Sequence, residues 1–160
     1  MSDKMFLRST DIQALPEEAK RHFLNSKATR HTKSLGDAAG LKNLGVHWVR
    51  VEAGDDSTEF HVHHYEEECV YIIAGTATAI LGDESFSVMA GDFIAYPCNG
   101  VPHKIVNHSS EPLIYLLVGE RRAHDISDYP AAGKRLYRNT GRWDLVDLMA
   151  IDDPRKKLPR

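Results

Sequence analysis

Three histidines and two glutamates, in two short stretches of the chain, have the residue types and spacing of a metal site. The first stretch, FHVHHYEEE, ends at Glu68. On a β-strand side chains alternate between faces, so His61 and His63 should point the same way and Val62 the opposite way. Two imidazoles and a carboxylate form a donor set that suits iron, manganese, nickel or zinc and leaves positions open. Both Glu67 and Glu68 could supply the carboxylate, and alternation alone does not choose between them.

A third imidazole, His103, lies in the second stretch, VPHKIVN, which also reads as a strand. Here Lys104 should alternate outward while His103 and Ile105 face inward. A single histidine on an apolar strand is more often an ordinary core residue. The pair of histidines and the nearby acid change that balance, and we therefore predict His103 as a fourth ligand.

Composition narrows the class of protein around this site. The chain has 160 residues, a formal net charge of −3 and 42 % hydrophobic residues, as expected for one globular domain. Basic residues are spread along the chain, so we expect no nucleic-acid partner and no anionic membrane surface. No apolar run is long enough for a signal peptide or a membrane span, which predicts a cytoplasmic protein. Cys69 and Cys98 are too few for a disulfide framework and should be reduced.

Most of the chain has the texture of short antiparallel strands. Between residues 43 and 118, runs rich in Val, Ile, Tyr, Phe and Thr alternate with Gly, Pro, Asn and Asp. These runs predict an all-β antiparallel barrel or sandwich, because parallel strands would need long helical crossovers. The expected strands cover 44–53, 57–63, 68–74, 76–81, 84–89, 92–96, 101–107 and 112–118.

The two ends of the chain differ from this central region. In residues 11–25, Pro16 followed by Glu17 and Glu18 favours the start of a helix, so we predict a short helix there. After Gly119 the chain becomes polar with only short apolar pieces. We therefore predict an N-terminal extension over 1–42 that packs on the barrel, the barrel itself over 43–119, and a tail over 120–160 that packs outside it.

Both histidine stretches resemble the sequence motifs of the cupin superfamily. The segment from Gly54 to Gly75 is similar to the first motif, G-x5-H-x-H-x(3,4)-E-x6-G. The second motif, G-x5-P-x-G-x2-H-x3-N, is matched by Gly91, Pro97, Gly100, His103 and Asn107. One extra residue precedes His61 and one lies between Pro97 and Gly100, both in turns where insertions are tolerated.

This resemblance implies a single-domain bacterial cupin, a double-stranded β-helix with a jelly-roll-like barrel. It favours Glu68 over Glu67, because six residues then separate the acid from Gly75. It further implies a homodimer and one divalent transition metal, held by His61, His63, Glu68 and His103 near the barrel mouth. Neither the residues nor the resemblance identifies the metal or a catalytic residue.

Such a site admits several functions on a small organic molecule. With no dedicated base evident inside the barrel, metal-dependent dioxygenase-type chemistry is the first prediction. A metal-dependent isomerase of sugars or keto acids is the alternative, in which the metal polarises a carbonyl. A non-enzymatic module that binds or senses a small ligand is a further alternative. A purely structural barrel is disfavoured, because it would not need the four ligands.

Overall fold

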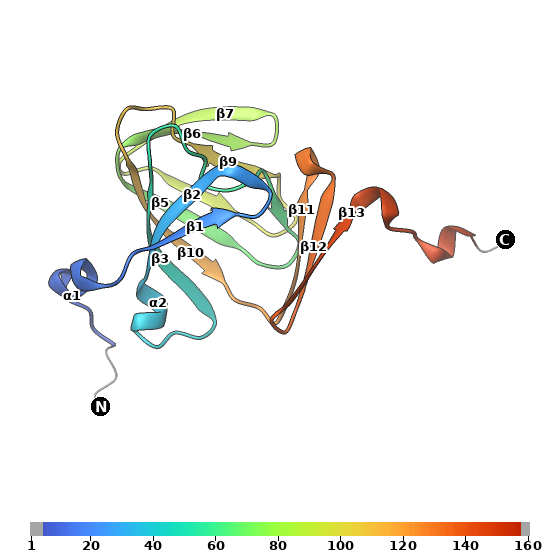
Figure 1. The fold of residues 1–160 in the computed structure, drawn as a ribbon, viewed down its shortest axis with the longest axis horizontal. Helices are drawn as coiled ribbons and strands as arrows, with labels where there is room; N and C mark the ends of the chain where they lie inside the picture. Colours follow the sequence, from blue (N-terminus) through green and yellow to red (C-terminus); the bar gives the residue numbers. More distant parts are fainter. Residues whose placement is uncertain (1–4, 158–160) are drawn as a thin grey trace.

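The strands pair into three antiparallel sheets in the computed structural model, which describes residues 5–157 (Figure 1). The largest sheet contains, in spatial order, β1 (Glu18–His22), β2 (Asn25–Ser34), β3 (Leu44–Val51), β10 (Leu113–Glu120), β5 (Glu68–Ala74) and β8 (Phe93–Tyr96). The second contains β13 (Arg142–Asp147), β12 (Lys134–Asn139), β11 (His124–Tyr129) and β4 (Val62–His63). The third contains β7 (Glu84–Met89), β6 (Thr76–Leu81) and β9 (His103–Val106).

Single bridges connect the segment before β4 to the third sheet. Asp56 pairs with Val106 and His61 pairs with His103, both antiparallel. Over residues 5–157 no pairing joins the sheets into one closed hydrogen-bonded ring. The arrangement is an open double-stranded β-helix, and the predicted all-β fold class is confirmed.

Seven of the eight expected strands occur within about two residues of their predicted bounds. The exception is the strand predicted over 57–63, which is reduced to β4 and the bridge at His61. Three strands that the sequence did not predict, β11, β12 and β13, follow the central region. They place residues 124–147, which belong to the tail predicted over 120–160, in a sheet with β4.

The helix predicted over residues 11–25 is wrong in most of its length. A six-residue helix, α1 (Ser9–Ala14), ends at Leu15, whose backbone is extended at φ −61° and ψ 142°. Proline disfavours the helical conformation in the residue before it, and Pro16 therefore ends the helix. The polar run after it forms β1 instead, because the register from Glu18 opposite Thr32 provides backbone hydrogen bonds with β2. Strand pairing in this hairpin thus overrides local helix propensity.

The remaining helical elements are single turns. They are α2 (Leu35–Ala38) and the 3-10 turns η1 (Pro130–Ala132), η2 (Leu148–Ala150) and η3 (Pro154–Lys157). Within the part of the chain that the structure covers, no helix is long and apolar enough to cross a bilayer.

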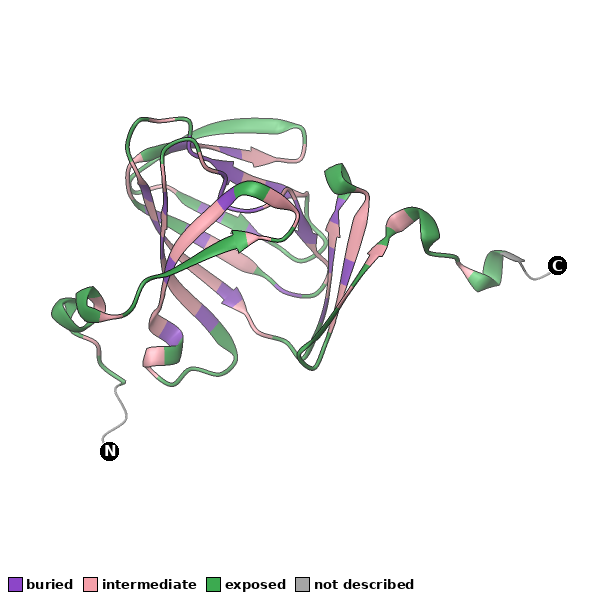
Figure 2. Cartoon of the chain, viewed as in Figure 1, coloured by how far each residue is buried: buried purple, intermediate pink, exposed green. Residues whose placement is uncertain are grey.

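The hydrophobic core lies between the large sheet and the three-stranded sheet. Figure 2 shows the buried residues concentrated in this central region, whereas α1 and the segment after β13 project from it and are largely exposed. The core residues are Val49, Val51, Val70, Ile72, Ala77, Ala79, Val88, Ile94, Tyr96, Ile105, Leu113 and Tyr115. They alternate along their strands with outward-facing side chains, as the predicted period of two requires.

Asn107, which matches the last position of the second motif, organises a turn rather than the cavity. Its side chain is fully buried and donates hydrogen bonds to the carbonyls of Val51 and Glu111. Its amide oxygen accepts from the backbone and hydroxyl of Ser109. Both the amide nitrogen and the amide oxygen of Asn107 are thereby used in hydrogen bonds that hold the loop before β10 against the end of β3.

Gly75 should be the more sensitive of two glycines with a left-handed backbone. Gly75 (φ 85°) and Gly91 (φ 96°) both adopt it, but a Cβ at Gly75 would lie 2.5 Å from the Pro112 carbonyl oxygen. Nothing lies within 4 Å of a Cβ at Gly91. We expect Gly91→Ala to lower the free energy of unfolding by about 1–2 kcal/mol. We expect Gly75→Ala to lower it by about 1–3 kcal/mol more, because the backbone at Pro112 must move to make room for the Cβ. Urea unfolding of both variants measures the difference, and equal losses would contradict the steric argument.

Candidate metal centre

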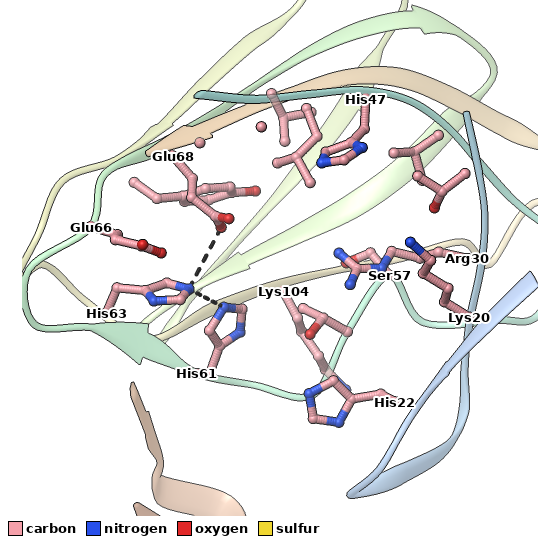
Figure 3. A pocket seen from close by; sticks show the side chains of 18 of the residues that line it. Lys20, His22, Arg30, His47, Ser57, His61, His63, Glu66, Glu68 and Lys104 are labelled. Atoms are coloured by element: carbon pink, nitrogen blue, oxygen red, sulfur yellow. Dashed lines mark hydrogen bonds and ion pairs between the residues drawn. The ribbon is translucent and has the colours of Figure 1, made fainter. Parts of the chain in front are cut away.

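A cavity of about 710 Å³ runs between the sheets, with His61, His63 and Glu68 at one end (Figure 3). This volume is within the usual range for small-molecule sites. Its walls include Val49 and His47 from β3, Val70 from β5 and Tyr115 from β10. His61, His63, Glu68 and His103 all line it.

His61 and His63 bring their Nε2 atoms to 3.2 Å from each other. The Nδ1 atom of His61 lies 2.8 Å from the Glu59 carbonyl oxygen, and that of His63 lies 2.6 Å from Asp125 Oδ2. Since a carbonyl or an ionised carboxylate can only accept, both Nδ1 atoms carry the donated proton. In the neutral rings, both Nε2 atoms therefore present lone pairs to the same point.

Two lone pairs at this distance need a positive charge between them. A proton on His63 Nε2 could be donated to His61, or a metal ion could bind both nitrogens. Two nitrogens about 2.1 Å from one ion lie roughly 3.0–3.4 Å apart at ordinary coordination angles. The observed separation therefore already suits a shared ion.

Glu68 supplies the carboxylate of this group. Its Oε2 lies 3.8 Å from His63 Nε2, and the ligand atoms of His61, His63 and Glu68 are all within 4.8 Å of one another. Glu68 begins β5 and is paired in register with Gly119 of β10. A Cβ at Gly119 would lie 3.0 Å from Glu68 Oε1, so the absence of a side chain at Gly119 leaves space for the carboxylate.

His103 lies beside this group without completing it. Its ring centroid is 4.7 Å from that of His61, but it does not belong to the mutually close cluster. Tyr96 stacks on it face to face, with centroids 3.6 Å apart. Its Nδ1 lies 3.3 Å from the Val101 carbonyl, and its buried Nε2 has no hydrogen-bond partner among the described residues. Such an orphaned acceptor in the cavity wall suits a ligand of an ion.

The charges around these imidazoles favour a cation. Glu66, Glu68 and Asp125 contribute three carboxylates, while Arg138 forms ion pairs with Glu66 and Asp125. When all are ionised, two negative charges remain uncompensated at this end of the cavity. The donor set and the charge balance therefore fit a divalent transition metal, with His61, His63 and Glu68 as a group that could hold it and His103 adjacent.

Asp125 orients His63 from a part of the chain that the sequence prediction treated as an outer tail. Besides accepting from His63, it accepts backbone hydrogen bonds from Tyr65 and Glu66 and one from the Ser127 hydroxyl. It is 2 % exposed. A carboxylate behind a histidine ligand sets the ring tautomer and increases its basicity, which metal centres commonly use.

These surroundings shift the pKa values of the imidazoles in opposite directions. Burial, aided by the neighbouring His63 and His103 rings, lowers the pKa of His61 to about 3. Burial likewise lowers the pKa of His103 to about 4. It also acts to lower the pKa of His63, but the hydrogen bond to Asp125 and the Glu68 charge outweigh it and raise that pKa. For Asp125, the hydrogen bonds from His63 and the backbone outweigh burial and lower the pKa to about 2.

Several other sequence predictions can be compared with the structure. Because His64 directly follows His63, alternation along the strand predicts that it points away from the cavity; it lies outside the cavity lining and pairs with Asp128. For His47 the sequence pattern favours core packing with one hydrogen bond over a place in the cavity wall, but the residue lines the cavity and contacts Ser34 Oγ at 3.0 Å.

His22 lies outside the strands expected from the sequence, which gives it no role, yet it also lines the cavity. Glu66 precedes the strand that begins at Glu68, and the sequence predicts that it faces solvent beside the barrel mouth; it is instead 3 % exposed and lies next to His63.

Sequence reasoning missed the residues of β11 that support the site. Asp125, Ser127 and Tyr129 alternate with more exposed residues along β11 and are all buried. Tyr129 stacks at 5.8 Å on His61. The period-two pattern in HDISDY was the available signal, but buried polar residues on an inward face do not resemble the apolar alternation by which strands are usually recognised.

Comparison with protein-family models matches residues 47–119 to the cupin domain. A search of curated proteins finds no match. Among solved structures, a candidate sugar phosphate isomerase from Acidithiobacillus ferrooxidans is 44 % identical, with a TM-score of 0.91. The alignment covers 94 % of this chain and 96 % of that one.

More distant structures share the fold. A cupin-superfamily sugar phosphate isomerase from Silicibacter pomeroyi is 24 % identical over 88 % of this chain and 92 % of that one, with a TM-score of 0.79. The polyketide cyclase RemF from Streptomyces resistomycificus is 20 % identical over 72 % of this chain and 80 % of that one, with a TM-score of 0.60.

Loss of the imidazole of His61 or of His103 should release the metal. We expect His61→Ala and His103→Ala to lose bound metal after reconstitution while the far-ultraviolet circular dichroism of the strands is retained. His64→Ala is the control, because this neighbouring histidine points outward. Elemental analysis gives the metal content per chain. Stoichiometric metal in either cavity variant would show that the substituted residue is not a ligand.

Removing the Asp125 charge should weaken metal binding without removing a ligand. We expect Asp125→Asn to lower affinity for Zn²⁺ by about 10–100-fold, because His63 becomes less basic and less firmly oriented. Asp128→Asn is the matched control on the same strand, since Asp128 pairs with His64 and Arg135 outside the cavity. Competition with a chromophoric chelator measures both affinities. An equal effect of the two substitutions would mean that Asp125 acts only through general stability.

Proposed function

The chain belongs to the cupin superfamily, and we propose that it is a metal-dependent isomerase of a phosphorylated sugar. The observation that carries this proposal is the convergence of His61, His63 and Glu68, with the unpartnered His103 Nε2 beside them, inside a cavity large enough for such a substrate. The 44 % identity with the Acidithiobacillus ferrooxidans protein supports sugar phosphates as the substrate class.

The chemistry divides between the metal and the chain. A bound divalent metal would act as a Lewis acid that polarises the sugar carbonyl. His61, His63, Glu68 and His103 would hold it, and Asp125 would keep His63 in the tautomer that binds through Nε2. Tyr96, which stacks on His103, restricts the orientation of that ring. Tyr96 is itself buried and keeps water from this part of the cavity wall. A fixed ring orientation avoids reorganisation during the reaction.

Isomerisation of an aldose to a ketose also requires a group that moves a proton between adjacent carbons. Glu66 is our candidate, because its buried carboxylate lines the cavity beside His63. Its Oε1 accepts from the Arg122 backbone N–H at 2.6 Å and forms an ion pair with Arg138. These contacts hold the carboxylate in place. The base that the sequence did not reveal is thus proposed at a residue expected to lie in solvent.

Dioxygenase-type chemistry is the second candidate, because the same donor set also suits iron and would leave positions open. The cytoplasmic location also remains a prediction.

The homodimer likewise remains a prediction. In support of it, β5 and β8 carry an apolar surface, with Tyr71, Ile73 and Phe93 exposed, that a second copy of the chain could cover.

Reconstitution with single metals tests the function directly. We expect protein loaded separately with Mn²⁺, Fe²⁺, Co²⁺, Ni²⁺ or Zn²⁺ to interconvert at least one pair of aldose and ketose phosphates, and chelator-treated protein to be inactive. Proton NMR in D₂O follows both the products and deuterium uptake at the reacting carbons. No conversion by protein with one metal per chain would refute the proposal. Oxygen consumption by the iron-loaded form would then favour the dioxygenase.

Substitution of Glu66 should separate proton transfer from metal binding. We expect Glu66→Gln to lower kcat by about 10²–10⁴-fold with unchanged metal content, because the amide keeps the shape but cannot accept the proton. Glu67→Gln is the control, since the neighbouring acid is exposed. Steady-state kinetics and elemental analysis provide the two measurements. A kcat within twofold of the wild-type value would place the proton acceptor elsewhere.

A further inference from the structure

The end of the cavity opposite the imidazoles contains positively charged side chains. Lys20 of β1 and Arg30 of β2 are paired in register, so they lie side by side on the same face of the sheet. Figure 3 shows Arg30, Lys20 and Ser57 across the cavity from His63 and Glu68. Both basic residues line the cavity. One cavity therefore has a carboxylate-rich end and a cationic end.

Arg30 differs from the other partly buried cations of this cavity in having no counter-ion. Lys104 pairs with Asp56 at 2.8 Å, and Arg121 and Arg138 pair with Asp37 and Glu66. Lys20 pairs with Glu18 at 3.1 Å near the surface, its side chain 51 % exposed. Among the ion pairs within residues 5–157, none includes Arg30.

The position of Arg30 is nevertheless well defined. Its guanidinium lies beside the hydroxyl of Tyr115, a residue that is 2 % exposed and belongs to the core. His22 lies near it, and burial together with the Arg30 charge lowers the pKa of His22 to about 4. At neutral pH His22 is therefore uncharged and does not add to the cationic charge. Arg30 is thus a partly buried guanidinium in the cavity with no carboxylate paired to it among residues 5–157, whereas Arg21, which also lines the cavity without a paired carboxylate there, is exposed.

An unpaired guanidinium that is partly removed from water is costly unless an anion binds it. The planar fork of arginine fits the oxygens of a phosphate group in a two-point contact, and the charge strengthens both hydrogen bonds. Lys20 adds a second positive charge beside it. We propose that Arg30 is the phosphate-binding residue of this cavity and that it orients a phosphorylated sugar with its reacting end toward His61, His63 and Glu68.

This inference rests on the proposed function for the identity of the anion, but its phosphate site can be tested without catalysis. Inorganic phosphate is titrated into chelator-treated protein, so that it cannot bind a metal, and ³¹P NMR reports the dissociation constant. We expect wild-type protein to bind phosphate, Arg30→Met to bind it about 10–100-fold more weakly, and Arg30→Lys to recover part of the loss.

Arg50→Met is the matched control. Arg50 lies on the adjacent strand β3, outside the set of residues that line the cavity, and pairs with Glu17, so the substitution changes the net charge equally. We expect it to leave phosphate binding unchanged. Equal phosphate affinity of wild-type and Arg30→Met protein, or no phosphate binding by the wild type, would overturn the assignment. An equal loss in Arg50→Met would also overturn it, because the effect would then come from net charge.

Thermal unfolding separates a binding role from a structural one. An unpaired cation contributes little to folding, so Arg30→Met should not lower Tm in phosphate-free buffer, whereas phosphate should raise the Tm of the wild type more than that of the variant. A lower Tm of Arg30→Met without phosphate, with equal stabilisation of both by phosphate, would make Arg30 a structural partner of Tyr115 and refute the proposal.

The phosphate site and the proposed function can fail separately. Phosphate binding that depends on Arg30, without isomerisation of any sugar phosphate, would support this site and refute the isomerase. Isomerisation with the same KM in wild-type and Arg30→Met protein would support the isomerase and refute this site.

Discussion

The site depends on three imidazoles whose Nδ1 atoms are all engaged, so that their Nε2 atoms are left for the cavity. The Glu59 and Val101 carbonyls and the Asp125 carboxylate are the three acceptors. Each acceptor determines which ring nitrogen carries the proton, and thereby where the lone pair points. A change in any of these hydrogen bonds would rotate or protonate a donor. The geometry of the centre is therefore set as much by the contacts behind the rings as by the rings themselves.

Strand β11, which follows the segment with the cupin motifs, supplies side chains that hold these imidazoles in place. The family match ends at residue 119, whereas Asp125, Ser127 and Tyr129 lie beyond it and contact His63 or His61. Pairing of β11 with β4 places Ser127 opposite His63. Because the orienting carboxylate comes from this added sheet, the cupin motifs alone do not make up the functional unit.

The two ends of the cavity have opposite electrostatic character, which constrains what can bind. Carboxylates and imidazoles gather at one end, and the unpaired Arg30 with Lys20 lies at the other. A ligand with oxygen donors at one end and an anionic group at the other would satisfy both. This polarity connects the proposed isomerase with the proposed phosphate site, and an apolar substrate would satisfy neither end.

The sequence by itself determined the central strands and the His-x-His pair on one face and, with the cupin resemblance, led to the prediction of Glu68 rather than Glu67 as the acid. These features follow from local periodicity and spacing, because alternation along a strand is fixed by the backbone. The ligand role of His61, His63, Glu68 and His103 stays a prediction, although the structure brings the first three together.

Only the tertiary structure decided that the second half of the 11–25 segment, predicted as helix, enters the β1–β2 hairpin, that Glu66 is buried, and that Asp125 lies behind His63. The hairpin is held in the large sheet by pairing of β2 with β3, and the other two features depend on contact between segments far apart in the chain, such as β11 with β4. Local sequence carries no record of which distant strand will supply the hydrogen bonds or the counter-charge. Polar residues such as Asp125 and Arg30 therefore look like surface positions until the fold encloses them.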